Sequence, residues 1–251
     1  MTQVRIVTPI TTEGFTEPAI FESIAFDGTT VSQVSIDKGP ASIEGEFEEA
    51  LAVPDTLAKI LEAERDGIDA VVIDCMGDPG LAPGREAADM LVLGPCQTSM
   101  HVAALLAHNF SVITVLDTLV VFFEDLATRY GLKEKLVSVR SVDIPVLELE
   151  DDMDRLNRAL LDESIKAIEE DGAHSLIFGC TGLKGCSTEL TRGLGQRGYG
   201  NVPVIDPVLA AFKVAEALVG LGLTHSKRTF PPPRSKEITG YDFVVRERAP
   251  V

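Results

Sequence analysis

A twelve-residue stretch occurs twice in this chain, and the repetition limits the folds open to it. The first copy, residues 66–77, reads DGIDAVVIDCMG, and the second copy, residues 171–182, reads DGAHSLIFGCTG. Each copy contains Asp-Gly, a short apolar run and Cys-x-Gly, and the matching positions lie 105 residues apart. We interpret the copies as the same strand in two halves of a duplicated fold, each strand ending at a thiol.

Flanking segments support the duplication because they match in the same order in both halves. Upstream, residues 6–12 resemble residues 112–118, and downstream, residues 91–95 resemble residues 203–207. Two unrelated domains would not preserve this order. The repeat therefore predicts a chain built from two copies of one structural unit.

The predicted domain boundaries follow from this repeat. We expect residues 1–97 and 208–251 to form the first domain. Residues 98–207 are expected to form the second domain, its internal duplicate. The segment that starts at Val208 is predicted to be a helix that packs back on the first half.

Short apolar runs alternate with segments of helical periodicity in both halves. The predicted strands are residues 3–8, 30–36, the run ending at Cys75, 91–93, 111–115, 136–142, 174–179 and 202–205. The predicted helices are one ending near Phe26, residues 54–66, one beginning at Arg85, 95–108, 117–130, 152–170, 186–194 and 208–221. Such alternation is typical of parallel sheets covered by helices. We therefore predict an α/β fold of two domains related by a pseudo-twofold axis, each with a parallel sheet of about four strands.

Both repeated cysteines lie at the carboxyl ends of predicted strands, where sheets of this kind bind their ligands. We predict that Cys75 and Cys180 face one cleft between the domains from opposite sides. Two opposed thiols can invert a carbon next to a carbonyl, because one thiolate removes a proton and the other thiol delivers one to the opposite face. This chemistry needs one charged cysteine, so we expect at least one pKa below about 8.5, with helix N-termini supplying part of the shift.

Other residues near these strand ends are predicted to bind the substrate. The main-chain amides of Met76, Gly77, Thr181 and Gly182 are expected to hold carbonyl oxygens or a developing enolate. Threonine hydroxyls in the loops are candidates for hydrogen bonds to a polar ligand, and capping of strand ends is the alternative role for them. The threonines assigned to the site are Thr8, Thr114, Thr118 and Thr181.

The remaining polar residues have simpler interpretations. A structural role is the alternative for any cysteine, and it is our prediction for Cys96 and Cys186, which have no counterpart in the repeat. Asp206 either orients a group in the cleft or caps the helix that follows it. The four histidines are dispersed, and neither a metal-binding spacing nor a phosphate-binding loop motif occurs, so we expect no metal and no cofactor.

Composition argues against several other classes of protein. A net charge of −17 disfavours nucleic-acid binding, which needs a basic face. The apolar runs are too short to span a bilayer, and no signal-peptide pattern precedes the first strand. Four cysteines without a close pairing pattern indicate reduced thiols. We therefore expect a cytoplasmic protein that binds a small molecule and neither nucleic acid nor membrane.

Several segments together resemble the aspartate/glutamate/hydantoin racemase superfamily, and within it the hydantoin and allantoin racemase branch. The similar segments are residues 40–45 (PASIEG), 75–81 (CMGDPGL) with Arg85-Glu86, 143–147 (DIPVL), 179–183 (GCTGL), 202–206 (VPVID) and 221–227 (LGLTHSK). The resemblance runs from about Val4 to Lys227. It implies two α/β domains, cofactor-independent chemistry with two bases and commonly a homo-oligomer, and it places the two catalytic cysteines at Cys75 and Cys180.

The resemblance also implies a substrate-contacting loop at Thr8, Pro9 and Ile10, where this sequence departs from the Asn-Pro-Asn-Thr usual in the branch. The loop after Cys180 lacks the acidic residue of the amino-acid racemases, which argues against free aspartate or glutamate. Our first hypothesis is a racemase or epimerase of a 5-substituted hydantoin or allantoin-like compound. The alternatives are a maleate cis–trans isomerase, an arylmalonate-type decarboxylase and a noncatalytic small-metabolite-binding protein. A decarboxylase of this type resembles the family with only the second cysteine, so the presence of Cys75 disfavours it.

Overall fold

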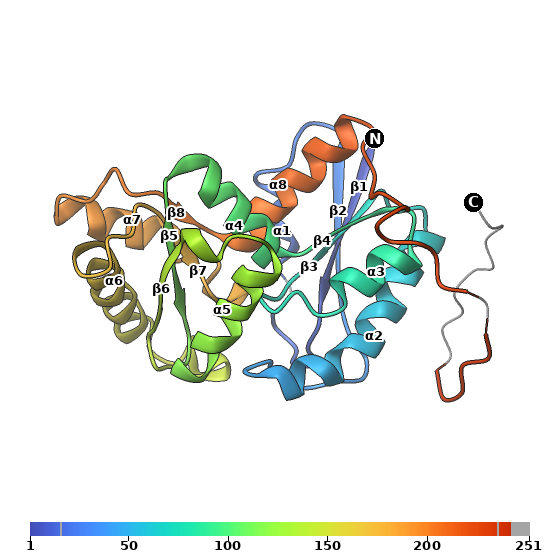
Figure 1. The fold of residues 1–251 in the computed structure, drawn as a ribbon, viewed down its shortest axis with the longest axis horizontal. Helices are drawn as coiled ribbons and strands as arrows, with labels where there is room; N and C mark the ends of the chain where they lie inside the picture. The colour runs from blue at the N-terminus through green and yellow to red at the C-terminus, as the bar shows by residue number, and fades with distance from the viewer. Residues whose placement is uncertain (16, 235, 242–251) are drawn as a thin grey trace.

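Two parallel sheets lie side by side, and helices cover them (Figure 1). The computed structural model describes residues 1–15, 17–234 and 236–241. The first sheet has the strand order β2-β1-β3-β4 and the second the order β6-β5-β7-β8, so both share one topology. The strands are β1 (Thr2–Thr8), β2 (Thr29–Ser35), β3 (Ala70–Ile73), β4 (Leu91–Leu93), β5 (Phe110–Thr114), β6 (Leu136–Ser141), β7 (Leu176–Phe178) and β8 (Val204–Ile205). The predicted α/β fold with two four-stranded parallel sheets is confirmed.

The helices also follow one another in the same order in both halves. The α-helices are α1 (Pro18–Glu22), α2 (Glu46–Arg65), α3 (Leu81–Ala87), α4 (Pro95–Leu106), α5 (Val120–Arg129), α6 (Met153–Glu169), α7 (Ser187–Gln196) and α8 (Pro207–Gly220). The short 3-10 helices are η1 (Asp117–Leu119), η2 (Lys133–Lys135), η3 (Val146–Glu148) and η4 (Thr181–Leu183). By position in the chain, α2, α3 and α4 correspond to α6, α7 and α8. Within the described ranges, no helix combines the length and the apolar character needed to cross a bilayer.

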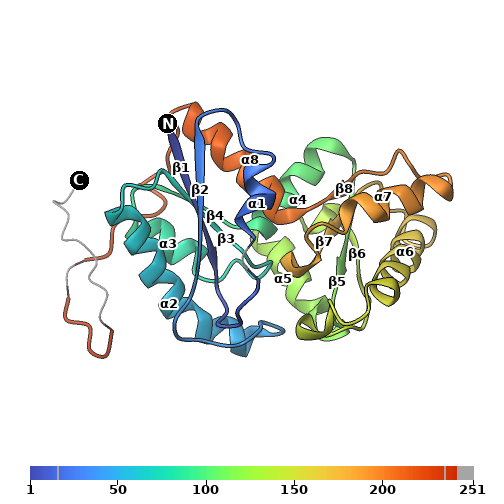
Figure 2. The ribbon, with the colours of Figure 1, turned by 180° about the vertical axis from the view of Figure 1, so that it is seen from behind.

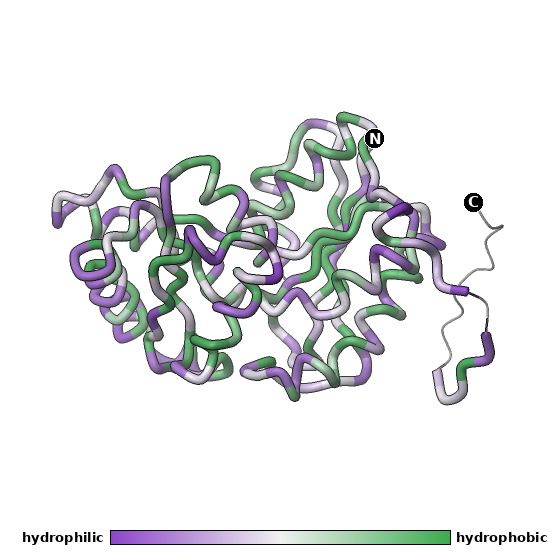
Figure 3. The backbone as a smooth tube through the Cα atoms, viewed as in Figure 1, coloured by the Kyte–Doolittle hydropathy of each residue, from purple (hydrophilic) through white to green (hydrophobic). Residues whose placement is uncertain are grey.

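Apolar clusters lie on both faces of the first sheet, which explains why β3 and β4 consist of apolar residues alone, whereas the edge strand β2 is only partly buried. Side chains alternate between the two faces of a strand. Val4 and Ile6 of β1 lie in a core cluster with Phe212 of α8, whereas Val7 lies in a second cluster with Ile60 of α2. In Figure 3 the strands of this sheet are mostly hydrophobic, while outer helices such as α6 are hydrophilic along much of their length.

Helices α4 and α8 connect the two halves, because each helix follows a strand of one sheet and packs in the other half of the molecule. Helix α4 follows β4 of the first sheet, but its residues Cys96 and Met100 belong to the core of the second half. Helix α8 follows β8 of the second sheet, but its residues Ala211 and Phe212 pack against the first. The two helices lie against each other between the sheets (Figure 2). Because of these two crossovers, the carboxyl ends of the strands in both sheets face the same region between the halves.

The repeated Asp-Gly pair is a structural feature at the opposite ends of the strands. Gly67 and Gly172 follow the helices α2 and α6 and have φ angles of +79° and +73°, a left-handed conformation that glycine adopts without steric cost. Each neighbouring aspartate ion-pairs with an arginine. Asp66 lies 2.7 Å from Arg5, and Asp171 lies 2.6 Å from Arg140. The repeat thus encodes a helix-to-strand connection as well as a thiol.

Three predicted helix boundaries are wrong. Helix α2 begins at Glu46 instead of Pro54, which lies inside the helix. Proline favours the first turn of a helix, which is why the sequence suggested a start there, but three glutamates near residue 46 favour the positive end of the helix dipole. Helix α3 contains Arg85 in its last turn and not at its start. Helix α1 ends at Glu22, before the predicted end near Phe26.

Candidate active site

The two repeated cysteines lie at the carboxyl ends of matching strands and line the same two cavities. Cys75 follows β3 by two residues, and Cys180 follows β7 by two residues. Each cavity has a volume of about 40 Å³ and is lined by both cysteines, Ile43 and Thr181. Since Thr181 comes from the second half and Ile43 from the first, the cavities lie between the halves. The structure thus brings together the two thiols that the repeat singled out.

The two cavities differ in the charged side chains that line them, and we name the one with charged residues the polar cavity. The polar cavity carries Thr8, Asp74 and Lys184 in its wall, together with apolar side chains that include Ile10 and Phe15. The other cavity has no charged residue among its described lining residues, and its wall includes Met76, Val115, Leu119, Phe122 and Phe123. A ligand that reaches both thiols therefore meets charged side chains in one cavity and, among the described lining residues, none in the other.

Each sulfur accepts a hydrogen bond from a main-chain amide two residues further along. The amide of Gly77 donates to Sγ of Cys75 over 3.5 Å, and the amide of Gly182 donates to Sγ of Cys180 over 3.3 Å. A Cβ atom at Gly77 would lie 2.7 Å from Oε2 of Glu49. A Cβ atom at Gly182 would lie 3.3 Å from the sulfur of Cys180. Gly182 therefore keeps space beside its thiol, whereas Gly77 keeps space for the side chain of Glu49.

The pKa shifts of the two thiols run opposite to our expectation from the sequence. Removal of the sulfurs from water raises the pKa of Cys180 to about 11 and raises the pKa of Cys75 well above its usual value. The amides of Gly77 and Gly182 lower these pKa values, but less than burial raises them. The predicted fall in pKa is wrong because the structures that follow the thiols, α3 and η4, are short and the sulfurs are desolvated.

Asp74, which the sequence interpretation missed, forms part of the polar cavity wall. Its side chain is 6% exposed. Oδ2 accepts hydrogen bonds from Thr8 at 3.3 Å and from Gln33 at 3.4 Å, whereas Oδ1 is buried without a hydrogen-bond partner in the described part of the chain. Burial raises the pKa of this carboxyl, while Lys184 and the nearby hydroxyls lower it. The sequence signal that could have identified Asp74 is a charged residue directly before a cysteine at the end of a strand.

Two hydrogen bonds close the polar cavity across the halves. The ammonium group of Lys184 donates to the main-chain oxygen of Phe15 over 2.8 Å. The amide of Val146 donates to Oε1 of Glu44 over 2.7 Å. Residues 15 and 44 come from the first half, and residues 146 and 184 come from the second. The loops that carry these residues therefore meet across the polar cavity.

Buried carboxyl groups also lie behind the Cys75 loop. Asp78 accepts hydrogen bonds from the amides of Cys96 and Gln97, at 3.0 and 2.9 Å, and from the hydroxyl of Tyr130 at 2.6 Å. It therefore caps α4 and ties the loop to the end of α5. Burial raises the pKa of Asp78 to about 6. Burial, followed by repulsion from Asp78, raises the pKa of Glu49 to about 7.

Comparison with known proteins agrees with this geometry. Residues 4–215 match the family described as Asp/Glu/Hydantoin racemase. The chain is 41% identical to the hydantoin racemase of Rhizobium meliloti, over 95% of this chain and 98% of that protein. The chain belongs to the Asp/Glu/hydantoin racemase family. The predicted family is thereby confirmed, and so is the prediction of an isomerase of the racemase type.

Solved structures of relatives share the fold of this Asp/Glu/hydantoin racemase family member along its length. The allantoin racemase from Klebsiella pneumoniae superposes with a TM-score of 0.89 at 33% identity, over 97% of this chain and all (100%) of that chain. The allantoin racemase from Pseudomonas fluorescens superposes with a TM-score of 0.87 at 33% identity, over 95% of this chain and 100% of that chain. The two-sheet arrangement is thus shared with racemases.

Most of the predicted binding residues of this racemase family member line a cavity, but three do not. The cavity-lining ones are Thr8, Ile10, Met76, Gly77, Thr181 and Gly182. Pro9 is buried next to them, and Thr118 is exposed outside both cavities. Thr114 is fully buried, and its hydroxyl donates to the main-chain oxygen of Gly179 over 3.5 Å. That contact matches the alternative role of strand-end bonding, and binding by these residues stays a prediction.

The other residues considered from the sequence have structural contacts. Cys96 and Cys186 are buried and line neither cavity. Asp206 accepts a hydrogen bond from the amide of Leu209 over 3.3 Å and thereby caps α8. No group of three or more His, Cys, Asp or Glu side chains in the described ranges is arranged to hold a metal ion.

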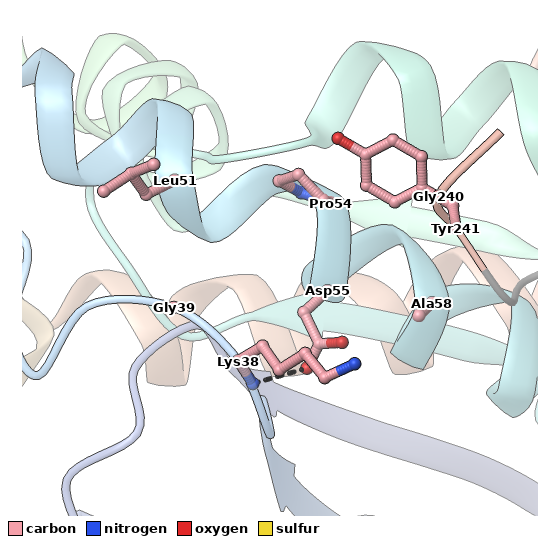
Figure 4. A pocket seen from close by; sticks show the side chains of 8 residues that line it. All are labelled: Lys38, Gly39, Leu51, Pro54, Asp55, Ala58, Gly240 and Tyr241. Carbon is pink, nitrogen blue, oxygen red and sulfur yellow. Dashed lines mark hydrogen bonds between the residues drawn. The ribbon is translucent and has the colours of Figure 1, made fainter.

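A cavity larger than those beside the cysteines lies away from them. It has a volume of about 380 Å³ and is lined by residues of α2, by the loop before that helix and by Gly240 and Tyr241. Figure 4 shows Pro54 and Tyr241 on one side of this cavity and Lys38 and Asp55 on another. The amide of Lys38 donates to Oδ2 of Asp55 over 3.2 Å. Size alone therefore does not identify the site of the family's chemistry.

Proposed function

We propose that this protein is a cofactor-independent racemase of a 5-substituted hydantoin or allantoin-like compound, with Cys75 and Cys180 as acid and base. The observation that supports this proposal is that both thiols line both cavities at matching strand ends. The similarity to hydantoin and allantoin racemases supports the choice of a ring substrate.

The reaction follows from the placement of the two thiols. The thiolate of one cysteine removes the proton from the ring carbon next to the carbonyl, which leaves an enolate, and the thiol of the other cysteine protonates the opposite face. The first cysteine ends as a thiol and the second as a thiolate, so the charge of the pair is conserved and the reverse reaction exchanges their roles. The amides of Gly77 and Gly182 stabilise whichever sulfur is charged.

Cys180 is the sulfur that we propose to ionise first. Burial raises the pKa of both thiols. Asp74 and Glu44 raise the pKa of Cys180 further, whereas the Gly182 amide and Lys184 lower it. The charged side chains near Cys75 are Glu49 and Asp78, and both raise its pKa further. Carboxyl groups thus act on both thiols, and the cation of Lys184 beside Cys180 is the difference that favours a thiolate there.

Hydrogen–deuterium exchange with optical rotation tests the proposal. Enantiopure allantoin and 5-monosubstituted hydantoins are incubated in D₂O and followed by proton NMR and polarimetry. Wild-type protein is expected to exchange the proton at the stereocentre and to remove the optical rotation. Cys75→Ser and Cys180→Ser are each expected to lower racemisation by more than roughly a thousandfold, because an alcohol is a far weaker acid than a thiol.

Cys186→Ala provides the matched control, since Cys186 is buried outside both cavities. Circular dichroism confirms that all three variants are folded. The control is expected to racemise within about threefold of wild type. Racemisation within tenfold of wild type in either serine variant would contradict the two-thiol mechanism. Absence of exchange with every ring compound, in folded wild-type protein with reduced thiols, would contradict the ring substrate.

A further inference from the structure

We propose that Asp74 determines substrate specificity by accepting a hydrogen bond from an N–H group bonded to the substrate's stereocentre. This inference rests on the proposed racemase function and names its substrate class more closely. The preferred substrates are cyclic amides and ureides in which that nitrogen is unsubstituted. Dicarboxylic acids, which lack such a donor, are not expected to be substrates.

The hydrogen bonds of Asp74 are incomplete within the protein. Its side chain is 6% exposed, and its Oδ1 atom has no partner in the described part of the chain. The hydroxyl of Thr181 lies close by, but it donates over 3.1 Å to the main-chain oxygen of Asp74. The two bonds to Oδ2, from Thr8 and Gln33, are long at 3.3 and 3.4 Å. A buried carboxyl oxygen without a donor is costly, so such an atom points to a donor that arrives with a ligand.

The position of Asp74 relates this free acceptor to the reacting carbon. Asp74 precedes Cys75 in the chain and lines the cavity that both cysteines line. The carbon that loses its proton must lie between the two sulfurs. In a hydantoin ring this carbon is bonded to one N–H group and to one carbonyl carbon. The N–H group on the carbon is therefore the ring donor nearest to residues beside the thiols.

The duplicated fold offers this acceptor on one side only. The residue that corresponds to Asp74 in the second repeat is Gly179. A Cβ atom at Gly179 would lie 2.8 Å from the main-chain Cα of Thr114, so no side chain fits there. A ring that needs an acceptor for its N–H group thus has a single productive orientation. The two halves therefore differ at this position of the site, although each half supplies a thiol and a main-chain amide that donates to it.

The charges around the polar cavity favour a neutral ring over a dicarboxylate. Asp74 contributes a carboxyl group, and Lys184 is the single cation among the described lining residues. One N–H bond of that ammonium group is used by the main-chain oxygen of Phe15. A substrate with two carboxylates would place negative charge against Asp74, whereas an N–H group bonds to it. The acceptor oxygen of Asp74 and the donor ammonium group of Lys184 together match the N–H and C=O groups of a cyclic amide.

A pair of ring compounds tests the role of Asp74. The first probe is 5-methylhydantoin, and the second is 3-methylsuccinimide, in which a CH₂ group replaces the N–H group on the stereocentre. For each compound, the enzyme-catalysed rate of deuterium exchange at the stereocentre is measured and divided by the rate of uncatalysed exchange. Wild-type protein is expected to prefer the hydantoin. In Asp74→Ala, kcat/KM for the hydantoin is expected to fall by roughly tenfold to a hundredfold, while that for the succinimide changes by less than about threefold.

The ratio of the two substrates makes the test independent of folding yield. Any loss of folded protein, and any change in the ionisation of Cys180 when Asp74 is removed, acts on both probes equally. Asp74→Asn retains an acceptor oxygen and is expected to recover part of the preference for the hydantoin. Equal losses on the two probes would show a structural role and overturn the inference, with the racemase proposal intact. Absence of exchange by wild type with both probes, and also with allantoin and every other 5-monosubstituted hydantoin, would overturn both proposals.

Discussion

The hydroxyl of Thr181 donates a hydrogen bond of 3.1 Å to the main-chain oxygen of Asp74, which lies 107 positions earlier in the chain. Asp74 precedes one cavity-lining cysteine, and Thr181 follows the other. The bond is buried, so it is protected from competition by water. It therefore ties the carboxyl end of β3 to the carboxyl end of β7 and helps to fix the separation of the two thiols.

Replacement of Thr181 by valine removes this hydrogen bond and leaves the side-chain volume nearly unchanged. The main-chain oxygen of Asp74 then loses a donor, and we expect the free energy of unfolding to fall by about 1–3 kcal/mol. Racemisation is also expected to fall, because the two sulfurs are held less firmly. Urea unfolding and polarimetry measure the two effects.

The control for this variant is Thr128→Val, because the hydroxyl of Thr128 bonds within helix α5 on an exposed face. That substitution is expected to change the unfolding free energy by less than about 0.5 kcal/mol. An unchanged urea midpoint and unchanged racemisation in Thr181→Val would show that this bond has no part in holding the site.

Gly182→Ala is expected to impair catalysis with little loss of stability. The added Cβ atom would lie 3.3 Å from the sulfur of Cys180 and 3.1 Å from a methyl group of Leu149, so the thiol or its neighbour must move. A displacement of this kind at a reacting atom lowers kcat by roughly tenfold to a hundredfold. Steady-state racemisation kinetics and a thermal melt provide the measurement.

Gly220→Ala is the matched control, since a Cβ atom there meets nothing within 4 Å and its φ angle is not positive. The control is expected to keep wild-type kinetics. If Gly182→Ala has wild-type kcat as well, the space beside the sulfur is not needed for proton transfer.

The pH dependence of racemisation follows from the raised thiol pKa values. The pKa of Cys180 is about 11, so only a small fraction of this thiol is ionised near pH 7. Since the thiolate is the base, kcat/KM is expected to rise roughly tenfold per pH unit from about pH 7 to pH 10. Initial rates, corrected for uncatalysed racemisation at each pH, measure this slope. A plateau below pH 9 would show that the pKa of the catalytic thiol is not raised in the working enzyme.

Lys184 provides a second test of this ionisation. Its positive charge lowers the pKa of Cys180, against the larger effect of burial. Lys184→Met is therefore expected to lower kcat/KM at pH 8 by roughly threefold to tenfold and to move the rise in rate to higher pH. Lys184→Arg keeps the charge and is expected to retain most of the rate at pH 8. Identical pH profiles for the methionine and arginine variants would argue against this electrostatic role.

The sequence predicts the fold and the two thiols because those features repeat. The strand topology and the placement of Cys75 and Cys180 are encoded twice, once in each half. The pKa shifts of the thiols are not encoded locally, because desolvation depends on loops from both halves that meet across the polar cavity. The contact of Lys184 with Phe15 joins residues 169 positions apart. Asp74 was missed for the opposite reason, since it breaks the repeat and has glycine as its counterpart.

The raised pKa of Glu49 predicts that the free energy of unfolding depends on pH, and it sets the direction of that dependence. Burial and the neighbouring Asp78 raise its pKa in the folded state from 4.5 to about 7. The folded protein therefore binds a proton at Glu49 more tightly than the unfolded chain does. The stabilisation from this proton is fully present below about pH 4.5 and is lost as the pH rises through about 7. Glu49→Gln stays uncharged at every pH, so its advantage over wild type must grow across that window.

We expect Glu49→Gln to unfold at a higher urea concentration than wild type at pH 8.5. After allowance for partial exposure of the side chain, the gain amounts to about 1–3 kcal/mol at pH 8.5, falls to roughly two fifths of that value at pH 5.5 and approaches zero below about pH 4.5. Glu22→Gln is the control, because Glu22 is an exposed carboxylate in α1, outside the helix that carries Glu49. A stability difference between Glu49→Gln and wild type that is equal at the two pH values would show that Glu49 does not titrate between them.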